Sequence, residues 1–171
     1  MTSDHLPTDH PVKLLIGLDV GSTTVKALVV DPQTDTVLWR DYQRHDTRQP
    51  EKVLDFLQRM QADLRLPPAA FRLFATGSGG SGLCSFLGGK FVQEVTAVSL
   101  AVEKLYPQAN SVIELGGQDA KIIVFKETPG SGRKKKLPSM NDKCAGGTGA
   151  VIDKINAKLR ISPTELCNQG Y

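Results

Sequence analysis

Two short segments of the sequence carry the same order of polar residues between apolar runs. Residues 18–30 read LDVGSTTVKALVV and residues 113–125 read IELGGQDAKIIVF, and they align without a gap at a constant offset of 95. Each has an acidic residue at the end of an apolar run, then a polar turn with glycine, a lysine and a second apolar run. This pattern predicts a β-hairpin with a tight polar tip in each copy. The duplication predicts two related lobes that each open with such a hairpin.

In the first copy the candidate residues are a strand-end acid, the turn that follows it and one lysine: Asp19, Gly21, Ser22, Thr23, Thr24 and Lys26. Glycine lets the backbone approach a ligand, and hydroxyls and amides can hold phosphate oxygens. A strand-end carboxylate can hold a hydrated Mg²⁺ through water. Ordinary turns use the same residue types. The repetition favours function, because two facing turns can enclose a triphosphate from both sides.

The second copy offers a related set: Glu114, Gly116, Gly117, Gln118, Asp119 and Lys121. Glu114 replaces Asp19 and is one methylene longer, so it could reach the same metal shell or a water. Gln118 could orient a water near the terminal phosphate, and Asp119 could face the metal or cap the turn. The alternative is that Asp119 is a solvated turn acid and Lys121 a strand-edge lysine. Lys26 is open to the same two interpretations.

A third candidate is Cys144, in the glycine loop NDKCAGGTG of residues 141–149, ahead of a helix predicted to run to about Leu159. The helix dipole and free backbone amides there would stabilise a thiolate or an acidic cluster. An iron-sulfur cluster usually takes four thiolates. No spacing in the chain supplies four, so a cluster would have to lie between subunits. Cys84 and Cys167 are expected to be packed, and the histidines lie in polar surroundings without ligand-like spacing.

The rest of the chain predicts the elements that position these loops. Residues 128–138 predict an exposed turn, with the basic run 133–136 as a solvated hairpin tip. The spacing from Ser162 to Glu165 is that of a capping box and predicts a last short helix. Between the hairpins, apolar spacing predicts a strand at 37–42, a helix at 50–64, a strand at 71–75, a glycine-rich loop at 76–82 and a helix at 94–105. We therefore expect a disordered tail at 1–12, a first lobe at 13–108 and the start of a second, incomplete lobe at 109–171.

Composition excludes several classes of protein. The 171 residues are 40% hydrophobic and 23% charged, enough for a genuine core. The net charge of +3 is too mild to indicate nucleic-acid binding. No apolar run approaches the roughly 18 residues of a membrane span, and the polar start has no signal core. We expect a cytoplasmic protein without a membrane or nucleic-acid partner, and the three widely spaced cysteines argue against a disulfide framework.

Taken together, the segments 17–26, 113–121 and 141–149 resemble the signatures of a known family. They are similar to those of the ATP-dependent activators of 2-hydroxyacyl-CoA dehydratases and benzoyl-CoA reductases, the BadF/BadG/BcrA/BcrD ATPase family. That family lies within the acetate/sugar kinase, Hsp70 and actin superfamily. The third segment, with Cys144, is the specific part of the resemblance, since the first two would also fit sugar kinases.

The resemblance implies an α/β fold of ribonuclease H-like, actin-like ATPase lobes with mixed sheets and helices. It also implies ATP and Mg²⁺ between the lobes and a homodimer that shares one 4Fe-4S cluster. ATP hydrolysis would push an electron from ferredoxin or flavodoxin onto a 2-hydroxyacyl-CoA dehydratase or acyl-CoA reductase. By position, Asp19, Glu114 and Gln118 would be catalytic, the two turns with Lys26 and Asp119 would bind phosphate, Asp19 would hold Mg²⁺ through water, and Cys144 would bind the cluster. The helix after Cys144 would point its N-terminus at the cluster.

Two alternatives remain open at this point. One is a small-molecule, sugar-type kinase of the same superfamily, and the other is a non-catalytic nucleotide-sensing lobe in which Cys144 is incidental. A strand-end aspartate placed as a general base would favour the kinase, and none is identified in the sequence. Family members typically have aspartate where Glu114 stands, and the family's glycine motif for adenosine is absent. The 171-residue chain alone is therefore expected to be inactive.

Overall fold

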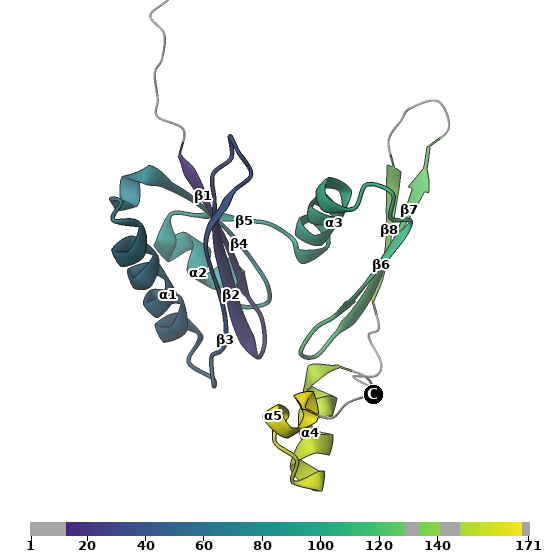
Figure 1. Cartoon of the computed structure of the whole chain (residues 1–171). Coiled ribbons are helices and arrows are strands. Elements are labelled where there is room, and N and C mark those ends of the chain that lie inside the picture. The colour runs from purple at the N-terminus through teal and green to yellow at the C-terminus, as the bar shows by residue number, and fades with distance from the viewer. Residues whose placement is uncertain (1–12, 129–133, 141–147, 169–171) are drawn as a thin grey trace, which may run out of the picture. The chain divides into compact units, whose positions relative to one another are not determined.

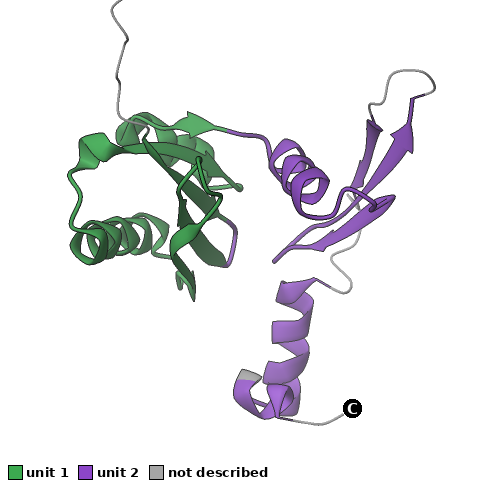
Figure 2. Ribbon diagram, turned by 45° about the horizontal axis from the view of Figure 1, so that its top comes forward, with its two compact units in different colours: residues 1–20, 24–91 green, residues 21–23, 92–171 purple. Residues whose placement is uncertain are grey.

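A computed structural model describes residues 13–128, 134–140 and 148–168 (Figure 1). The contacts divide the chain into two compact units, residues 1–20 with 24–91 and residues 21–23 with 92–171 (Figure 2). Each unit has its own sheet and helices, which confirms the predicted α/β class. The predicted tail at 1–12 lies outside the described residues, and the predicted lobe boundary after residue 108 stays a prediction.

The first unit contains a five-stranded mixed sheet in the order β3-β2-β1-β4-β5. Its first three strands are antiparallel neighbours, and β4 and β5 add in parallel on the other side of β1. This is the ribonuclease H-like arrangement that the family resemblance implied. The elements are β1 (Leu14–Val20), β2 (Thr24–Val30), β3 (Val37–Arg44), α1 (Gln49–Leu64), the 3₁₀ turn η1 (Pro68–Ala70), β4 (Phe71–Thr76), α2 (Gly80–Leu87) and β5 (Lys90–Phe91).

The core of this unit lies on one face of its sheet, where alternate residues of β1 and β2 are buried. Helix α1 covers that face with Val53, Phe56 and Met60, whose spacing of three and four places them on one side of a helix. Pro50 in the first turn suits the helix start. Helix α2, which the sequence analysis did not predict, adds Cys84 to the core, so the expected packing of this cysteine is confirmed.

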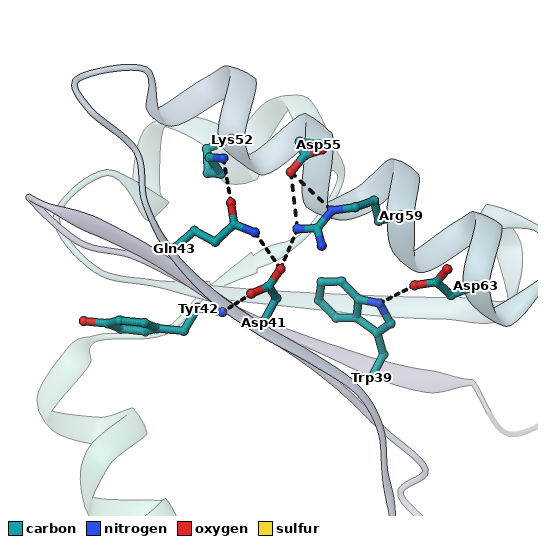
Figure 3. A network of polar contacts seen from close by, with 8 residues as sticks. All are labelled: Trp39, Asp41, Tyr42, Gln43, Lys52, Asp55, Arg59 and Asp63. Atoms are coloured by element: carbon teal, nitrogen blue, oxygen red, sulfur yellow. Dashed lines mark hydrogen bonds and ion pairs between the residues drawn. The ribbon is translucent and has the colours of Figure 1, made fainter. Parts of the chain in front are cut away.

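A polar network attaches β3 to α1 (Figure 3). Arg59 donates from Nη2 to Asp41 Oδ2 at 2.6 Å and lies 3.3 Å from Asp55 Oδ2. Partial burial raises the pKa of Asp41, but hydrogen bonds from the Arg59 guanidinium and its other donors outweigh this, so the net shift of the pKa is downward. Two further bonds join the same elements, Lys52 Nζ to Gln43 Oε1 at 2.7 Å and Trp39 Nε1 to Asp63 Oδ2 at 2.9 Å.

We expect Asp41→Asn to change the acid dependence of stability. A carboxyl whose pKa is lowered by folding stabilises the protein above its unfolded pKa, and the stabilisation is lost as the pH falls through the folded pKa. The variant should lose roughly 1 kcal/mol at pH 7, and its difference from the parent should shrink below about pH 4. Urea unfolding between pH 7 and pH 3 measures this. Asp55→Asn is the control and should change little, because the Asp55 side chain is 47% exposed.

The second unit contains the antiparallel sheet β6-β7-β8 and helices α3 to α5. The capping box predicted for the last helix is confirmed, since Glu165 N–H donates to Ser162 Oγ and Ser162 N–H donates to Glu165 Oε2. No helix among the described residues has the length and apolar character needed to cross a membrane. The elements are α3 (Glu94–Leu105), β6 (Ser111–Leu115), β7 (Ala120–Glu127), β8 (Lys134–Met140), α4 (Gly149–Leu159) and α5 (Pro163–Cys167).

Two expectations are wrong in this unit. The exposed turn predicted for residues 128–138 is a strand from Lys134 onward, because β8 pairs with β7. Two of its three lysines have partners: Lys134 Nζ donates to Pro107 O at 2.6 Å, and Lys136 pairs with Glu103 at 2.8 Å. Lys135 is exposed, and Arg133 of the predicted basic run lies outside the described residues. Cys167, expected to be packed, is exposed on α5.

Candidate functional site

The first polar hairpin brings its acid and its lysine together at the end of β1. Asp19 and Lys26 are directly opposite in the β1–β2 register, and Lys26 Nζ donates to Asp19 Oδ2 at 2.7 Å. The lysine side chain is 46% exposed and the aspartate 33% exposed, so a ligand can reach both. The turn residues 21–23 follow directly after β1. The hairpin expected from the sequence is therefore present, with its carboxylate at the strand end.

The glycine-rich loop after β4 packs against the same carboxylate, although the sequence analysis did not include it in the site. Thr76 pairs with Asp19 in the parallel register of β1 and β4, and Gly79 N–H donates to Val20 O at 2.9 Å. Gly77 has a φ of +87°, and a Cβ on it would lie 2.6 Å from Asp19 Oδ1. The Thr76 hydroxyl is buried and has no hydrogen-bond partner among the described residues. The sequence shows the glycine run, but the contact of this run with Asp19 arises only from the tertiary fold.

The second hairpin repeats the acid–lysine pair in a buried setting. Glu114 and Lys121 are opposite in the β6–β7 register, with Lys121 Nζ 3.7 Å from Glu114 Oε2. Lys121 also donates to Glu94 of α3, and its side chain is only 7% exposed. Burial lowers the pKa of Lys121, but the hydrogen bond to Glu94 and the charge of Glu114 outweigh it and raise the pKa overall. Lys121 is thus not a solvated strand-edge lysine.

The tip of the second hairpin is bonded to the start of α4. Gly116 N–H donates a hydrogen bond to Asp119 O at 2.8 Å, which closes the turn. Gln118 and Asp119 are exposed. Gly149 N–H donates to Gly116 O at 3.0 Å, and Ala150 N–H donates to Gly117 O at 2.8 Å. The amides of Gly149 and Ala150, at the helix N-terminus expected to face a thiolate, are therefore already used by the turn. Cys144 itself lies outside the described residues.

Among the described residues, Asp19 has the chemistry that a magnesium ion needs. Mg²⁺ keeps several waters and needs only one or two carboxylates beside substrate phosphates, which suits the accessible Asp19. Within the part of the chain that the structure describes, no three His, Cys, Asp or Glu side chains gather as a metal site. Cys84 is buried in the core and Cys167 is exposed on α5, so these two thiols do not assemble a cluster site.

The chain matches a known protein family. Residues 16–167 match the sequence model of the BadF/BadG/BcrA/BcrD ATPase family. The chain is similar to the (R)-2-hydroxyglutaryl-CoA dehydratase activating ATPase of Acidaminococcus fermentans, with 28% identity over 160 residues, or 91% of this chain and 57% of that protein. It thus spans little more than half the length of this curated relative.

Two solved structures are similar as well. Component A of the Acidaminococcus fermentans (R)-2-hydroxyglutaryl-CoA dehydratase superposes with a TM-score of 0.73 at 23% identity, over 93% of this chain and 60% of that one. This likeness shows the fold. The activator of the 2-hydroxyisocaproyl-CoA dehydratase from Clostridium difficile, with bound ADPNP, gives a TM-score of 0.70 at 25% identity, over 92% of this chain and 58% of that one.

Proposed function

The chain belongs to the BadF/BadG/BcrA/BcrD ATPase family, and from this we propose that it carries both phosphate-binding hairpins of an ATP-driven activator of a 2-hydroxyacyl-CoA dehydratase or related acyl-CoA reductase. The observation that carries the proposal is the duplicated hairpin. Asp19 with Lys26 and Glu114 with Lys121 occupy the same register in two sheets. The relative solved with bound ADPNP supports a nucleotide as the ligand.

We assign the metal contact, made through water, to Asp19 of the first hairpin. Asp19 is accessible, and its Oδ2 accepts from Lys26, so the lysine positions the carboxylate and can also meet a phosphate oxygen. The turn residues 21–23 would supply amides and hydroxyls for the phosphates, together with Thr24, which is buried at the start of β2. When bound, Mg²⁺ would neutralise phosphate charge near Asp19.

In the second hairpin the exposed tip has the contact role. Gly116 and Gly117 would approach the phosphates, Gln118 would orient a water and Asp119 would face the metal. Glu114 is already opposite Lys121, so its role is to hold the hairpin and, through a water, to extend the metal shell. This division follows from the burial of Lys121, which contrasts with the accessible Lys26.

We further propose that Cys144 contributes a thiolate to a 4Fe-4S cluster shared across a homodimer, which would pass electrons from ferredoxin or flavodoxin to the dehydratase. The support is the resemblance of residues 141–149 to the family's cysteine loop and the position of that loop in the chain, between β8 and α4. Because Gly149 and Ala150 bond to the second hairpin tip, nucleotide bound at that tip would act on the helix that follows Cys144.

Nucleotide binding by the 171-residue chain tests the central part of the proposal. We expect ADPNP with Mg²⁺ to bind, and Asp19→Asn to weaken this binding at least about tenfold by removing a charged ligand of the metal shell. Asp31→Asn is the matched control, because Asp31 follows the opposite end of β2 and caps a turn there. Calorimetric titration gives both affinities. Equal weakening by the two variants, or Mg²⁺-independent binding, would contradict the assignment.

Iron content tests the cluster separately. The full-length protein, purified and reconstituted without oxygen, should bind iron and sulfide, and Cys144→Ala should abolish this, whereas Cys167→Ala should not. A protein that binds ADPNP but no iron would support the nucleotide-sensing alternative. Phosphorylation of a sugar-type substrate would support the kinase.

A further inference from the structure

A second concave site lies within the first unit, at the opposite strand end from the polar hairpin. A cavity of about 670 Å³ opens between α1, the end of α2 and the starts of β1 and β4. Lys13 lines it, six positions before Asp19, a separation of roughly 20 Å along an extended strand. The cavity is therefore distinct from the phosphate-binding residues of this unit.

The walls of the cavity are mostly apolar, with Gln61 as a neutral polar residue among them. Its lining includes Ile16, Leu57, Met60 and Leu73, of which Ile16 and Met60 are almost fully buried. Phe86 stands at its edge with 87% of its surface exposed. Covering such a side chain is favourable by about 2 kcal/mol, so the exposed ring is a surface that a ligand can bury.

All charged residues that line the cavity are cations. They are Lys13, Arg72 and Lys90, and no aspartate or glutamate is among the lining residues. Within the described residues, none of the three forms an ion pair, in contrast to Lys26, Lys121 and Arg59, which all do. The cavity thus combines a hydrocarbon wall with a rim of uncompensated positive charge.

We propose that this cavity binds a small amphipathic anion, an aliphatic chain with a carboxylate head. The volume lies within the range of small-molecule sites, about 300 to 1,000 Å³, whose walls are mostly apolar with a few polar groups to orient the ligand. The aliphatic chain of the ligand would lie along Leu57, Met60 and Phe86. Its carboxylate would pair with Arg72 and Lys90. Arginine suits this role because its planar fork matches a carboxylate. The inference does not depend on the nucleotide site.

The methionines allow a direct test on the 171-residue chain. It has three methionines, of which Met60 lines the cavity and Met140 lies on β8 in the other unit. With ¹³C-methyl methionine, titration with octanoate should give a saturable shift of the Met60 signal and none of the Met140 signal. Octan-1-ol and octyltrimethylammonium should bind at least about tenfold more weakly, because a hydrogen-bonded charge pair contributes that much.

Charge reversal at the rim provides the variant test. Arg72→Glu with Lys90→Glu should weaken octanoate binding at least about tenfold. Arg40→Glu, on exposed β3, is the matched control and should leave it unchanged. Both rim residues are exposed, so the first unit is expected to stay folded, and circular dichroism of the double variant checks this. No shift at Met60, equal binding of octan-1-ol, or tighter binding of an acidic apolar peptide than of octanoate would overturn the proposal.

Discussion

Replacement of Lys121 by methionine is expected to lower the free energy of unfolding of the second unit by about 3 kcal/mol. The lysine is 7% exposed and compensates two carboxylates, Glu94 and Glu114, which are themselves only about one-third exposed. Methionine keeps the length of the side chain but leaves two like charges facing each other. Among the described residues, Glu114 Oε2 has no hydrogen-bond partner, and Lys121 is the only positive charge paired with it. The variant would remove that charge. Urea unfolding followed by circular dichroism measures the loss.

The internal repeat supplies the matched control for this variant. Lys26→Met removes the corresponding lysine of the first hairpin, where the side chain is 46% exposed and pairs with Asp19 alone. An exposed pair contributes about 0 to 1 kcal/mol, so the control should lose much less stability. Similar losses in the two variants would show that burial does not distinguish the two copies. Rescue of Lys121→Met by a second change, Glu94→Gln, would support charge repulsion as the cause.

Gly77→Ala is the second change with a large expected effect. It should lower the free energy of unfolding of the first unit by at least about 2 kcal/mol. The φ of +87° is a conformation that residues with a Cβ rarely adopt. The added methyl would also lie 2.6 Å from Asp19 Oδ1 and would meet the Val20 carbonyl. Because Asp19 must move, the affinity for ADPNP should fall together with stability. Thermal unfolding and calorimetric titration measure the two effects.

Gly82→Ala is the control for Gly77→Ala. Gly82 lies in α2, and a Cβ there meets nothing within 4 Å. Alanine has the higher helix propensity, so this variant should gain roughly 0.5 to 1 kcal/mol and keep its affinity for nucleotide. If Gly77→Ala behaved like Gly82→Ala, the close packing of the glycine loop on Asp19 would be contradicted.

The sequence predicts those parts of the fold whose signals are local. Both hairpins follow from alternating apolar residues around a polar turn, and the capping box at Ser162 fixes the start of α5. Helix α2 was missed because it begins with the run Gly80-Ser81-Gly82, whose residues favour loops. It is stabilised by tertiary packing of Leu83 and Leu87 on the core. Strand β8 was missed for a similar reason, since its three lysines are typical of solvated segments.

The sequence predicts the functional site only in part, for the same reason. The sequence identifies Asp19 and Glu114 because the repeat aligns them, but it does not reveal that Thr76 and Gly77 adjoin Asp19. That contact joins residues far apart in the chain through the parallel pairing of β1 and β4. Nor does the sequence distinguish the exposed Lys26 from the buried Lys121, because the difference arises from the ion pair between Lys121 and Glu94 on α3.

Strand β1 is hydrogen-bonded on both sides, to β2 and β4, whereas its counterpart β6 pairs only with β7 among the described strands. One flank of β6 thus presents a row of backbone donors and acceptors that act as a template for a further strand. Alongside that flank, Ile113 and Leu115 each have 65% of their surface exposed. On the opposite margin, β8 carries Pro138, which has no N–H to donate, beside several lysines. Among the described strands, β6 is therefore the flank that can accept a further strand, whereas the sequence of β8 disfavours one.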